Sequence, residues 1–405
     1  MENNNPKILV VSPTFPLPLV AGGKIRIFNI LKELSKNYDI TLLSLFETGV
    51  DSRSYLSQLE FLSRIELVPV SQSKTAQIKR LLRYSFHWLL GTPAEVLIKK
   101  SPALAAKLNE LIKREAFSLV QFEYIQTAQY LTKEIRDKCR TALVAHDISY
   151  ISQERKAHIA RGLAKLFWAR EAKLMKQYER GNWAKFNSIY TMSEVDIDYM
   201  NSPDTESFTA VIPNGVDTKK LKYQLRSGNR TIVFVGWMRH LPNRDAISWF
   251  IDGIWPIIRE SVKPVTLKIV GKGLPSEIIQ KVNADSAIHY LGYVDDIYEV
   301  VQDSTLSIVP IRIGSGSRLK ILESMALGTP VVSTTIGCEG IQASSDEVRL
   351  VDDPNTFAAE VLALLDNEEE RQKLSVNARA LVERRYGWES IGRSASELIQ
   401  QTIER

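Results

Sequence analysis

The sequence is poor in cysteine: its 405 residues include only Cys139 and Cys338, which lie far apart and in no CxxC pair. This excludes a disulfide framework and a cysteine-ligated zinc module, and it predicts a protein of the reducing cytoplasm. No apolar run approaches the roughly 18 to 20 residues that a membrane span needs. The N-terminus, MENNNPKILVV, has neither the basic stretch nor the cleavage site of a signal peptide. We therefore expect a protein that is neither secreted nor inserted across a bilayer.

Strong charge, metal-ligand clusters and repeats are also lacking. The net charge is only +5, so charge alone does not indicate nucleic-acid binding. No group of candidate metal ligands has ligand spacing, and we expect neither a metal site nor a cofactor. The composition, with 44% hydrophobic and 24% charged residues, is that of an ordinary globular protein. The length predicts two domains of roughly 200 residues each, because one compact core seldom grows that large.

Short runs rich in Val, Ile and Leu alternate with longer stretches of helical period, which is typical of βαβ units in a buried parallel sheet. The pattern occurs twice and predicts an α/β fold of two doubly wound, Rossmann-like domains facing each other across a cleft, where open α/β sheets bind ligands. The predicted strands are Lys7–Ser12, Asp39–Phe46, Arg64–Val70, Ser118–Tyr124, Ala142–Asp147, Ser188–Ser193 and Thr209–Ile212, then Thr231–Gly236, Val265–Gly271, Ile288–Leu291, Thr305–Pro310, Pro330–Thr335 and Glu347–Val351.

The break Pro213-Asn214-Gly215, followed by a polar and basic stretch, predicts the domain boundary. We expect one domain over residues 1–215 and a second over residues 216–386. The last residues, 387–405, are helical by period, and we expect this helix to pack back on the first domain.

The strongest local pattern is PIRIGSGSRLKILESMALGTPVVST, from Pro310 to Thr334. A glycine loop, Gly314-Ser315-Gly316, follows a predicted strand, and a helix is expected to begin at Ser317. The free N–H groups and the positive dipole end of such a helix form an anion site, and phosphate is the obvious anion.

Lys320 and Glu323 lie three residues apart in that helix and project from neighbouring parts of one face. Lys320 can neutralise a phosphate, and Glu323 can accept two hydrogen bonds from a ribose diol. The alternative is an exposed ion pair within the helix, which contributes only about 0.3 to 0.5 kcal/mol.

A second glycine loop, FVGWMRHLPNRDAISWF, follows the first predicted strand of the second domain. Gly236 ends the strand, Arg239 lies in the loop, and Asn243 is expected to precede a helix. Arg is suited to bidentate phosphate contact. The alternatives are that Arg239 is a solvated loop charge and that Asn243 is only a helix N-cap.

In the first half, Gly22 and Gly23 lie between the first strand and the first helix, where they allow close approach of a ligand or simply form a tight turn. The GxGxxG spacing of a dinucleotide site is missing, which argues against an oxidoreductase. His146 follows an apolar strand and could hydrogen-bond a sugar hydroxyl, although a structural histidine remains an alternative.

Two basic stretches, Lys74–Glu115 and Glu154–Lys185, each contain nine Lys or Arg against three acidic residues, with Phe86, Trp88 and Trp168 interleaved. A basic amphipathic helix with such aromatics can lie on an anionic membrane surface. A solvated helix face with its aromatics in the core is the alternative.

These motifs together resemble those of the retaining glycosyltransferases of the GT-B fold, specifically the family 4 group of bacterial cell-surface sugar transferases. The resemblance covers nearly the whole chain. It rests on KILVVSPTFPLPLVAGGKIR, YTMSEVD, VIPNGVD, FVGWMRHLPNRDAISWF, LKIVGKG, IHYLGYVDDI, GSGSRLKILESMALGTPVVSTTIGCEGI and RRYGW.

The resemblance implies that the first domain binds the acceptor and the second a nucleotide-diphosphate sugar. Glu323 would hold the ribose, and His146 would contact the donor sugar near the reacting carbon. With the loops above, the predicted donor-binding residues are Gly22, Gly23, Gly236, Asn243, Gly314, Ser315, Gly316, Ser317, Arg318 and Glu323, and the predicted catalytic residues are His146, Arg239 and Lys320.

Two departures from the family pattern stand out. The family's paired-glutamate motif has a Glu eight residues before Glu323, where this chain has Ser315. Many members also carry Arg and then Lys after the strand that ends at Gly236, whereas Trp237 follows directly here. Arg239, Arg318 and Lys320 would then carry the phosphate role.

The predicted function is metal-independent, retaining transfer of a sugar from a nucleotide-diphosphate donor to a glycan, lipid-linked or small-molecule acceptor in cell-surface glycan synthesis. The expected location is the cytoplasm or the inner membrane face. The rivals are a nucleotide-sugar epimerase of the same fold and a non-catalytic sugar-nucleotide-binding partner subunit. Donor hydrolysis with and without acceptors distinguishes the three.

Overall fold

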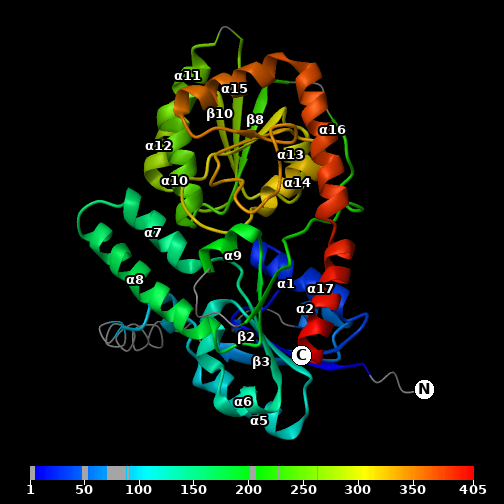
Figure 1. Cartoon of the computed structure of the whole chain (residues 1–405). Coiled ribbons are helices and arrows are strands. Elements are labelled where there is room, and N and C mark those ends of the chain that lie inside the picture. Colours follow the sequence, from blue (N-terminus) through cyan, green and yellow to red (C-terminus); the bar gives the residue numbers. More distant parts are fainter. Residues whose placement is uncertain are drawn as a thin grey trace. The chain divides into compact units, whose positions relative to one another are not determined.

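The computed structural model describes residues 5–47, 53–70, 88, 91–200, 207–225, 229–261 and 263–405. The chain divides into two compact units (Figure 1). The first unit comprises Met1–Pro213 and Trp388–Arg405, and the second is Asn214–Gly387.

The first unit is built on a parallel sheet with the strand order β3-β2-β1-β4-β5-β6-β7. The order reverses between β1 and β4, so these two strands form the topological switch point, where open α/β sheets bind ligands. The described strands are β1 (Lys7–Ser12), β2 (Asp39–Glu47), β3 (Arg64–Val70), β4 (Leu119–Glu123), β5 (Arg140–Val144), β6 (Ser188–Thr191) and β7 (Phe208–Val211).

Helices cover the sheet of the first unit and bury its strands. In β1 every residue after Lys7 is buried, and all five residues of β4 are buried. Such continuous apolar runs are expected of parallel strands that are covered on both faces. The described helices are α1 (Gly22–Leu34), α2 (Arg53–Leu56), α4 (Ala94–Ile98), α5 (Pro102–Arg114), α6 (Lys133–Lys138), α7 (Ser149–Ile159), α8 (Leu163–Trp183), α9 (Glu194–Met200) and α17 (Trp388–Glu404), with 3-10 turns η1 (Ser57–Leu59) and η2 (Ile125–Tyr130).

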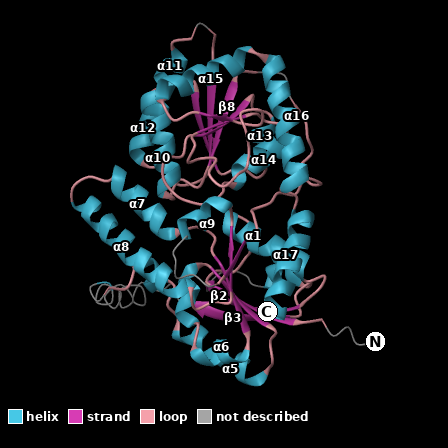
Figure 2. Ribbon diagram, in the orientation of Figure 1, coloured by secondary structure: helices cyan, strands magenta, loops and turns pink. Residues whose placement is uncertain are grey.

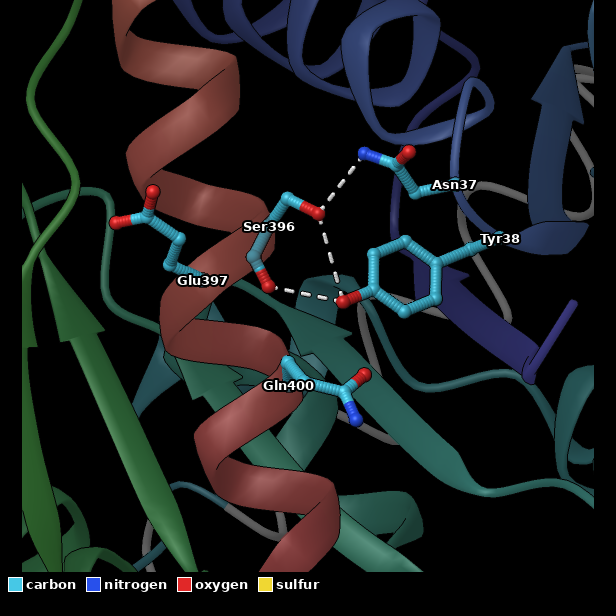
Figure 3. A pocket seen from close by; sticks show the side chains of 5 residues that line it. All are labelled: Asn37, Tyr38, Ser396, Glu397 and Gln400. Carbon is cyan, nitrogen blue, oxygen red and sulfur yellow. Dashed lines mark hydrogen bonds between the residues drawn. The ribbon is translucent and has the colours of Figure 1, made fainter.

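Helix α17, the last of the chain, belongs to the first unit and packs on α1. A Cβ on Gly392 would lie 2.2 Å from the Glu33 Cβ, so α17 packs this closely on α1 only because Gly392 has no side chain. The Tyr38 hydroxyl donates to the Ser396 carbonyl (2.8 Å), beside a pocket that also includes Asn37 (Figure 3). The C-terminal residues are therefore a structural part of the first unit.

The second unit has the parallel order β10-β9-β8-β11-β12-β13, with its switch point between β8 and β11. Helices α10, α11 and α12 lie to one side of this sheet and α13, α14 and α16 to the other (Figure 2). The described strands are β8 (Thr231–Val235), β9 (Thr266–Val270), β10 (Ile288–Gly292), β11 (Leu306–Val309), β12 (Val331–Ser333) and β13 (Arg349–Leu350). The described helices are α10 (Leu241–Trp249), the π-helix η3 (Phe250–Ile254), α11 (Trp255–Arg259), α12 (Ser276–Asn283), α13 (Ile297–Gln302), α14 (Leu319–Leu327), α15 (Pro354–Asp366) and α16 (Glu368–Arg385).

The structure confirms the α/β fold class, and a strand lies at each predicted position. Three expectations about helix starts were wrong. Helix α14 begins at Leu319, after the N-cap residue Arg318, and not at Ser317. Helix α10 begins at Leu241, because Pro242 favours the first helical turn, so Asn243 lies inside the helix. Gly22 and Gly23 are the first two residues of α1 and do not precede it.

Within the described residues, no helix is long and apolar enough to cross a membrane.

Candidate active site

The glycine loop of the second unit lies at the carboxyl end of β11, beside the switch point. Gly314 and Gly316 have φ angles of +109° and +76°, which only glycine adopts without strain. The loop folds around the Arg318 guanidinium, whose Nη1 donates to the Ser315 carbonyl (2.6 Å) and to the Gly316 carbonyl. Arg318 therefore shapes the loop from within.

Ser317, the residue between the loop and Arg318, is bound by a residue from the start of the unit. The Asn214 amide donates to the Ser317 Oγ (2.9 Å). Asn214 belongs to the IPNGVD segment, so this segment fixes the glycine loop as well as marking the domain boundary. Sequence reasoning missed this role, because the two residues are 103 positions apart.

Lys320, in the first turn of α14, is held by groups from β8 and α10. Its Nζ donates to the Val235 carbonyl (2.6 Å) and to the Asn243 Oδ1 (3.0 Å), and it lies 5.0 Å from the centroid of the Phe234 ring. Burial, together with the nearby Arg318 charge, lowers the pKa of Lys320 to about 7, against the opposing effect of Glu323. An ammonium has three N–H donors, and these two contacts leave one for a ligand.

Glu323 lies one turn further along α14 and is held by a tyrosine. The Tyr298 hydroxyl, from α13, donates to the Glu323 Oε1 (3.2 Å). Burial raises the pKa of Glu323, whereas the Tyr298 hydrogen bond and the Lys320 charge act in the opposite direction. No Lys320–Glu323 ion pair is found in the described part of the chain. Lys320 and Glu323 bind separate partners, so they do not form the exposed ion pair within the helix that was the alternative.

The loop after β8 packs tightly around Asn243. A Cβ on Gly236 would lie 2.7 Å from the Asn243 Cγ, and the Asn243 amide donates to the Trp237 carbonyl (3.0 Å). The N-cap of α10 is His240, so the N-cap alternative for Asn243 is wrong. Asn243 instead orients Lys320, to which it presents its carbonyl oxygen. Arg239 is exposed and packs on Gly273, where a Cβ would lie 2.7 Å from its Cγ.

An ion pair between the loop after β11 and helix α10 was missed by sequence reasoning. Arg312 binds Asp245 through two hydrogen bonds, of 3.0 Å from Nε and 2.6 Å from Nη2. Its guanidinium also lies 5.0 Å from the centroid of the Trp249 ring. This bidentate contact ties the loop after β11 to α10 and so fixes both sides of the Lys320 site.

A second polar cluster lies in the first unit, at the carboxyl ends of β4 and β5. The His146 Nε2 lies 2.6 Å from the Glu123 Oε2, and both side chains are less than one-tenth exposed. Gln121 donates to the other Glu123 oxygen (2.7 Å). The His146 ring stacks on Tyr124 with centroids 3.7 Å apart. Tyr124 has a φ of +66°, which is unusual for a residue other than glycine.

This cluster fixes the tautomer of His146. Burial lowers the pKa of His146, although Glu123 acts in the opposite direction, and a lowered pKa favours the neutral ring. Nε2 then carries the proton that Glu123 accepts, which leaves Nδ1 as a hydrogen-bond acceptor. A Cβ on Gly23 would lie 3.7 Å from this Nδ1 and 1.7 Å from the Tyr124 hydroxyl. Gly23 thus lets α1 approach the cluster, and Gly22 precedes it in the same turn.

Arg26, one turn into α1, is a buried structural residue. Its guanidinium donates to the Pro213 carbonyl (2.6 Å) and to the Ile212 carbonyl (2.7 Å). Burial lowers its pKa to about 10, against the opposing effect of Glu123. Arg26 therefore fastens the chain after β7 to the helix that carries Gly22 and Gly23.

The second unit is similar to a known protein family. Residues 229–367 match the family model described as glycosyl transferases group 1. The second unit therefore contains a glycosyl transferase group 1 domain. The matched residues include Gly236, Asn243, Lys320 and Glu323.

The chain is 22% identical over 394 residues to an uncharacterised 44.6 kDa protein in the cps region of Klebsiella pneumoniae, covering 94% of this chain and 96% of the relative. Sucrose-phosphate synthase of Thermosynechococcus elongatus has a TM-score of 0.75 at 16% identity, covering 99% and 100% of the two chains. Anabaena Alr3699/HepE in complex with UDP and glucose has a TM-score of 0.70 at 15% identity, covering 98% and 100%. These two likenesses show the GT-B fold.

Proposed function

We propose that this glycosyltransferase moves a sugar from a nucleotide-diphosphate sugar to an acceptor hydroxyl, with retention at the anomeric carbon and without a metal ion. The observation that carries the proposal is the buried Lys320 ammonium, which is held beside a glycine loop at a helix N-terminus and one turn from Glu323. This combination fits a diphosphate next to a ribose. A relative in a cps region and a structural neighbour that binds UDP and glucose support a role in cell-surface glycan synthesis.

In this proposal the protein supplies the positive charge that the reaction needs. As the glycosidic bond breaks, negative charge develops on the leaving diphosphate, and Lys320, the α14 N-terminus and Arg239 stabilise it. The leaving phosphate then accepts the acceptor proton on the face from which it departs, which gives retention. Glu323 accepts the ribose hydroxyls. Ser315 and the amides of its loop contact the hydroxyls of the donor sugar.

We propose that His146 takes part in the transfer through Nδ1. The neutral ring, oriented by Glu123 and Tyr124, presents this nitrogen as an acceptor for a sugar hydroxyl. In this proposal Gly22 gives a ligand close access to the backbone of α1, because the space beside Gly23 is already filled by the Tyr124 hydroxyl. Acceptors bind the first unit in this proposal, and the donor binds the second.

The test is a donor screen with the purified full chain. A panel of UDP- and GDP-sugars, beginning with UDP-glucose, is incubated with and without glycan acceptors in the presence of EDTA. We expect acceptor-dependent release of nucleotide and an α-linked product from an α-linked donor by NMR. Glu323→Gln and Lys320→Met should each reduce release, whereas the exposed control Lys281→Met should not.

The alternatives give different results. Conversion of the donor to free nucleotide without an acceptor, with an altered free sugar, indicates an epimerase. Nucleotide-sugar binding by calorimetry with no turnover of any donor indicates a non-catalytic partner subunit. An inverted anomeric product, or activity abolished by EDTA, contradicts the proposed chemistry.

A further inference from the structure

A polar cluster of the first unit has no role in the transfer described above. We call it the Glu95 cluster, and it consists of Glu95 on α4, Gln126 on η2 and Gln153 on α7. The Gln126 Nε2 donates to one Glu95 oxygen (2.6 Å), and the Gln153 Nε2 donates to the other (3.2 Å). A carboxylate has about four acceptor sites, and these two amides use two of them. The cluster therefore presents a carboxylate of fixed orientation that can accept further hydrogen bonds.

The Glu95 cluster lies on the sheet edge that carries His146. Gln126 follows β4 and Gln153 follows β5, and these two strands are neighbours in the sheet. Burial raises the pKa of Glu95, and the charge of Asp147, the residue directly after His146, acts in the same direction. Glu95 is also partly exposed. A ligand that binds beside His146 is therefore close to the Glu95 carboxylate.

Gln153 has a buried oxygen without a hydrogen-bond donor. The residue is only 2% exposed, and its Oε1 accepts no hydrogen bond within the described part of the chain. Turning the amide over would not help, because Oε1 would then face the Glu95 carboxylate. A buried acceptor without a partner destabilises the free protein. Since Oε1 belongs to the same planar amide as the Nε2 that binds Glu95, a ligand hydroxyl held beside Glu95 is in position to supply the missing donor.

Two buried carboxylates of α8 hold the helices that carry the cluster. The Glu171 Oε2 accepts a hydrogen bond from the Ala94 backbone N–H (3.0 Å), at the start of α4. The Glu179 carboxylate accepts from the first two backbone N–H groups of α7 (2.9 and 3.0 Å). Helix α8 also packs along α7 (Figure 1). Glu95 and Gln153 are therefore placed by one common helix.

These three glutamates belong to the two basic stretches of the sequence. Glu95 lies in the first stretch, and Glu171 and Glu179 lie in the second. Glu171 and Glu179 are buried, so the second stretch contributes to the interior of the unit as well as to its surface. Residues 71–87, 89 and 90 lie outside the described residues, and the prediction that these stretches bind a membrane surface stays a prediction.

The charges around Glu95 favour a neutral ligand. Lys156 is near enough to oppose the rise in the Glu95 pKa, and Glu95 in turn opposes the effect of burial, which lowers the pKa of Lys99. The two lysines would repel an ammonium group here, and Glu95 and Asp147 would repel a phosphate or a carboxylate. A hydroxyl donates to a carboxylate or an amide oxygen without either repulsion.

We propose that the Glu95 cluster binds the hydroxyl groups of a neutral saccharide acceptor. Two hydroxyls donate to the Glu95 carboxylate, and a third donates to the Gln153 Oε1 when a small shift of that side chain brings the buried oxygen to the ligand. Gln126 keeps Glu95 oriented. The inference rests on the proposed transfer, in which acceptors bind the first unit, and it adds the residues and the chemical class of the acceptor.

The test measures saccharide binding by the full chain and, separately, sugar transfer. The probes are the methyl glycosides of glucose, galactose and mannose, with methyl glucuronide and methyl glucosaminide as charged counterparts. Saturation-transfer NMR gives the dissociation constant of each probe without any need for turnover, and the donor found in the screen gives its KM as an acceptor. Calorimetry with UDP reports on the second unit.

We expect the neutral glycosides to bind more tightly than their charged counterparts. Glu95→Ala should weaken saccharide binding by about ten- to hundredfold and Gln153→Met by about three- to tenfold, with the affinity for UDP unchanged. Glu95→Gln keeps the size of the side chain, should give an intermediate loss, and decides the test if Glu95→Ala does not fold. The matched controls are Glu134→Gln on α6 and Gln400→Met on α17, which alter exposed side chains and should bind as the wild-type protein does.

The inference and the proposed transfer fail in different ways. Unchanged saccharide affinity in the Glu95 and Gln153 variants, with or without a lower melting temperature, shows a merely structural cluster and overturns the inference while sugar transfer stands. Saccharide binding that these variants lose, in a wild-type chain that transfers no sugar, supports the inference and contradicts the transfer. Tighter binding of a charged counterpart than of the neutral glycosides, or no binding of any saccharide, also overturns the inference.

Discussion

Lys320 should make nucleotide binding depend on pH. Its pKa of about 7 in the free protein means that half of the molecules carry an uncharged amine there at pH 7. A diphosphate binds the ammonium, so binding takes up a proton whenever the amine is neutral. The uptake should be about 0.5 proton per nucleotide at pH 7 and about 0.9 at pH 8.

The same linkage sets the affinity. Deprotonation of Lys320 multiplies the apparent dissociation constant by the factor 1 + 10^(pH − pKa), where the pKa is that of Lys320 in the free protein. This factor is about 2 at pH 7 and about 100 at pH 9. Affinity for UDP should therefore fall about 50-fold between these two values. Ionisation of the nucleotide contributes little to this change in affinity. Its terminal phosphate, like a phosphate monoester, has a pKa of about 6 and is already ionised above pH 7.

Isothermal titration calorimetry of the full chain with UDP measures both quantities, in buffers of different ionisation enthalpy at constant ionic strength. Lys320→Met should remove the proton uptake, and Lys320→Arg should make the affinity independent of pH because a guanidinium stays charged. Lys281→Met, which removes an exposed ammonium of α12, is the control and should keep the wild-type profile. A flat affinity between pH 7 and 9 in the wild-type protein would refute the assignment of Lys320 to the diphosphate.

Three further variants test the other clusters. Glu323→Ala should weaken nucleotide affinity by about 1.5 to 3 kcal/mol, measured by calorimetry, and an unchanged affinity would remove the ribose role. His146→Ala should lower turnover about 100-fold or more with nucleotide affinity nearly intact, and a lower melting temperature with normal turnover would show a structural histidine. Arg26→Met should reduce the free energy of unfolding, measured by urea denaturation, by about 3 to 5 kcal/mol. The reason is that the Ile212 and Pro213 carbonyls lose the hydrogen bonds from Arg26. A change below about 1 kcal/mol would contradict that reasoning.

The strands were predictable because each is a short apolar run between breaks, and parallel strands covered on both faces need such runs. The positions of the loops after β8 and β11 followed from the same pattern, and Gly314 and Gly316 marked a turn that needs positive φ. The start of α10 was harder. Pro242 fits the first helical turn, so the helix begins before Asn243, and no periodicity distinguishes the two starts.

The contacts that set the charge and pKa of the site residues could not be predicted from the spacing of residues along the sequence. Tyr298 binds Glu323 from another helix, and Asn243 binds Lys320 across 77 residues. The pairing of Glu123 with His146 joins the ends of two strands that are neighbours only in the folded sheet. Long-range contacts of this kind depend on strand order, which local sequence patterns do not encode.

The discontinuity of the first unit affects the order in which the chain can fold during synthesis. Residues 214–387 contain the whole second unit, whereas the first unit lacks α17 until residues 388–405 have been made. Until then, the Ser188 and Tyr190 hydroxyls have no Thr402 hydroxyl to bind, and the face of α1 beside Gly392 stays open. On the ribosome, the half that is translated later can therefore finish first, and a chain that stops at Gly387 leaves its earlier half incomplete.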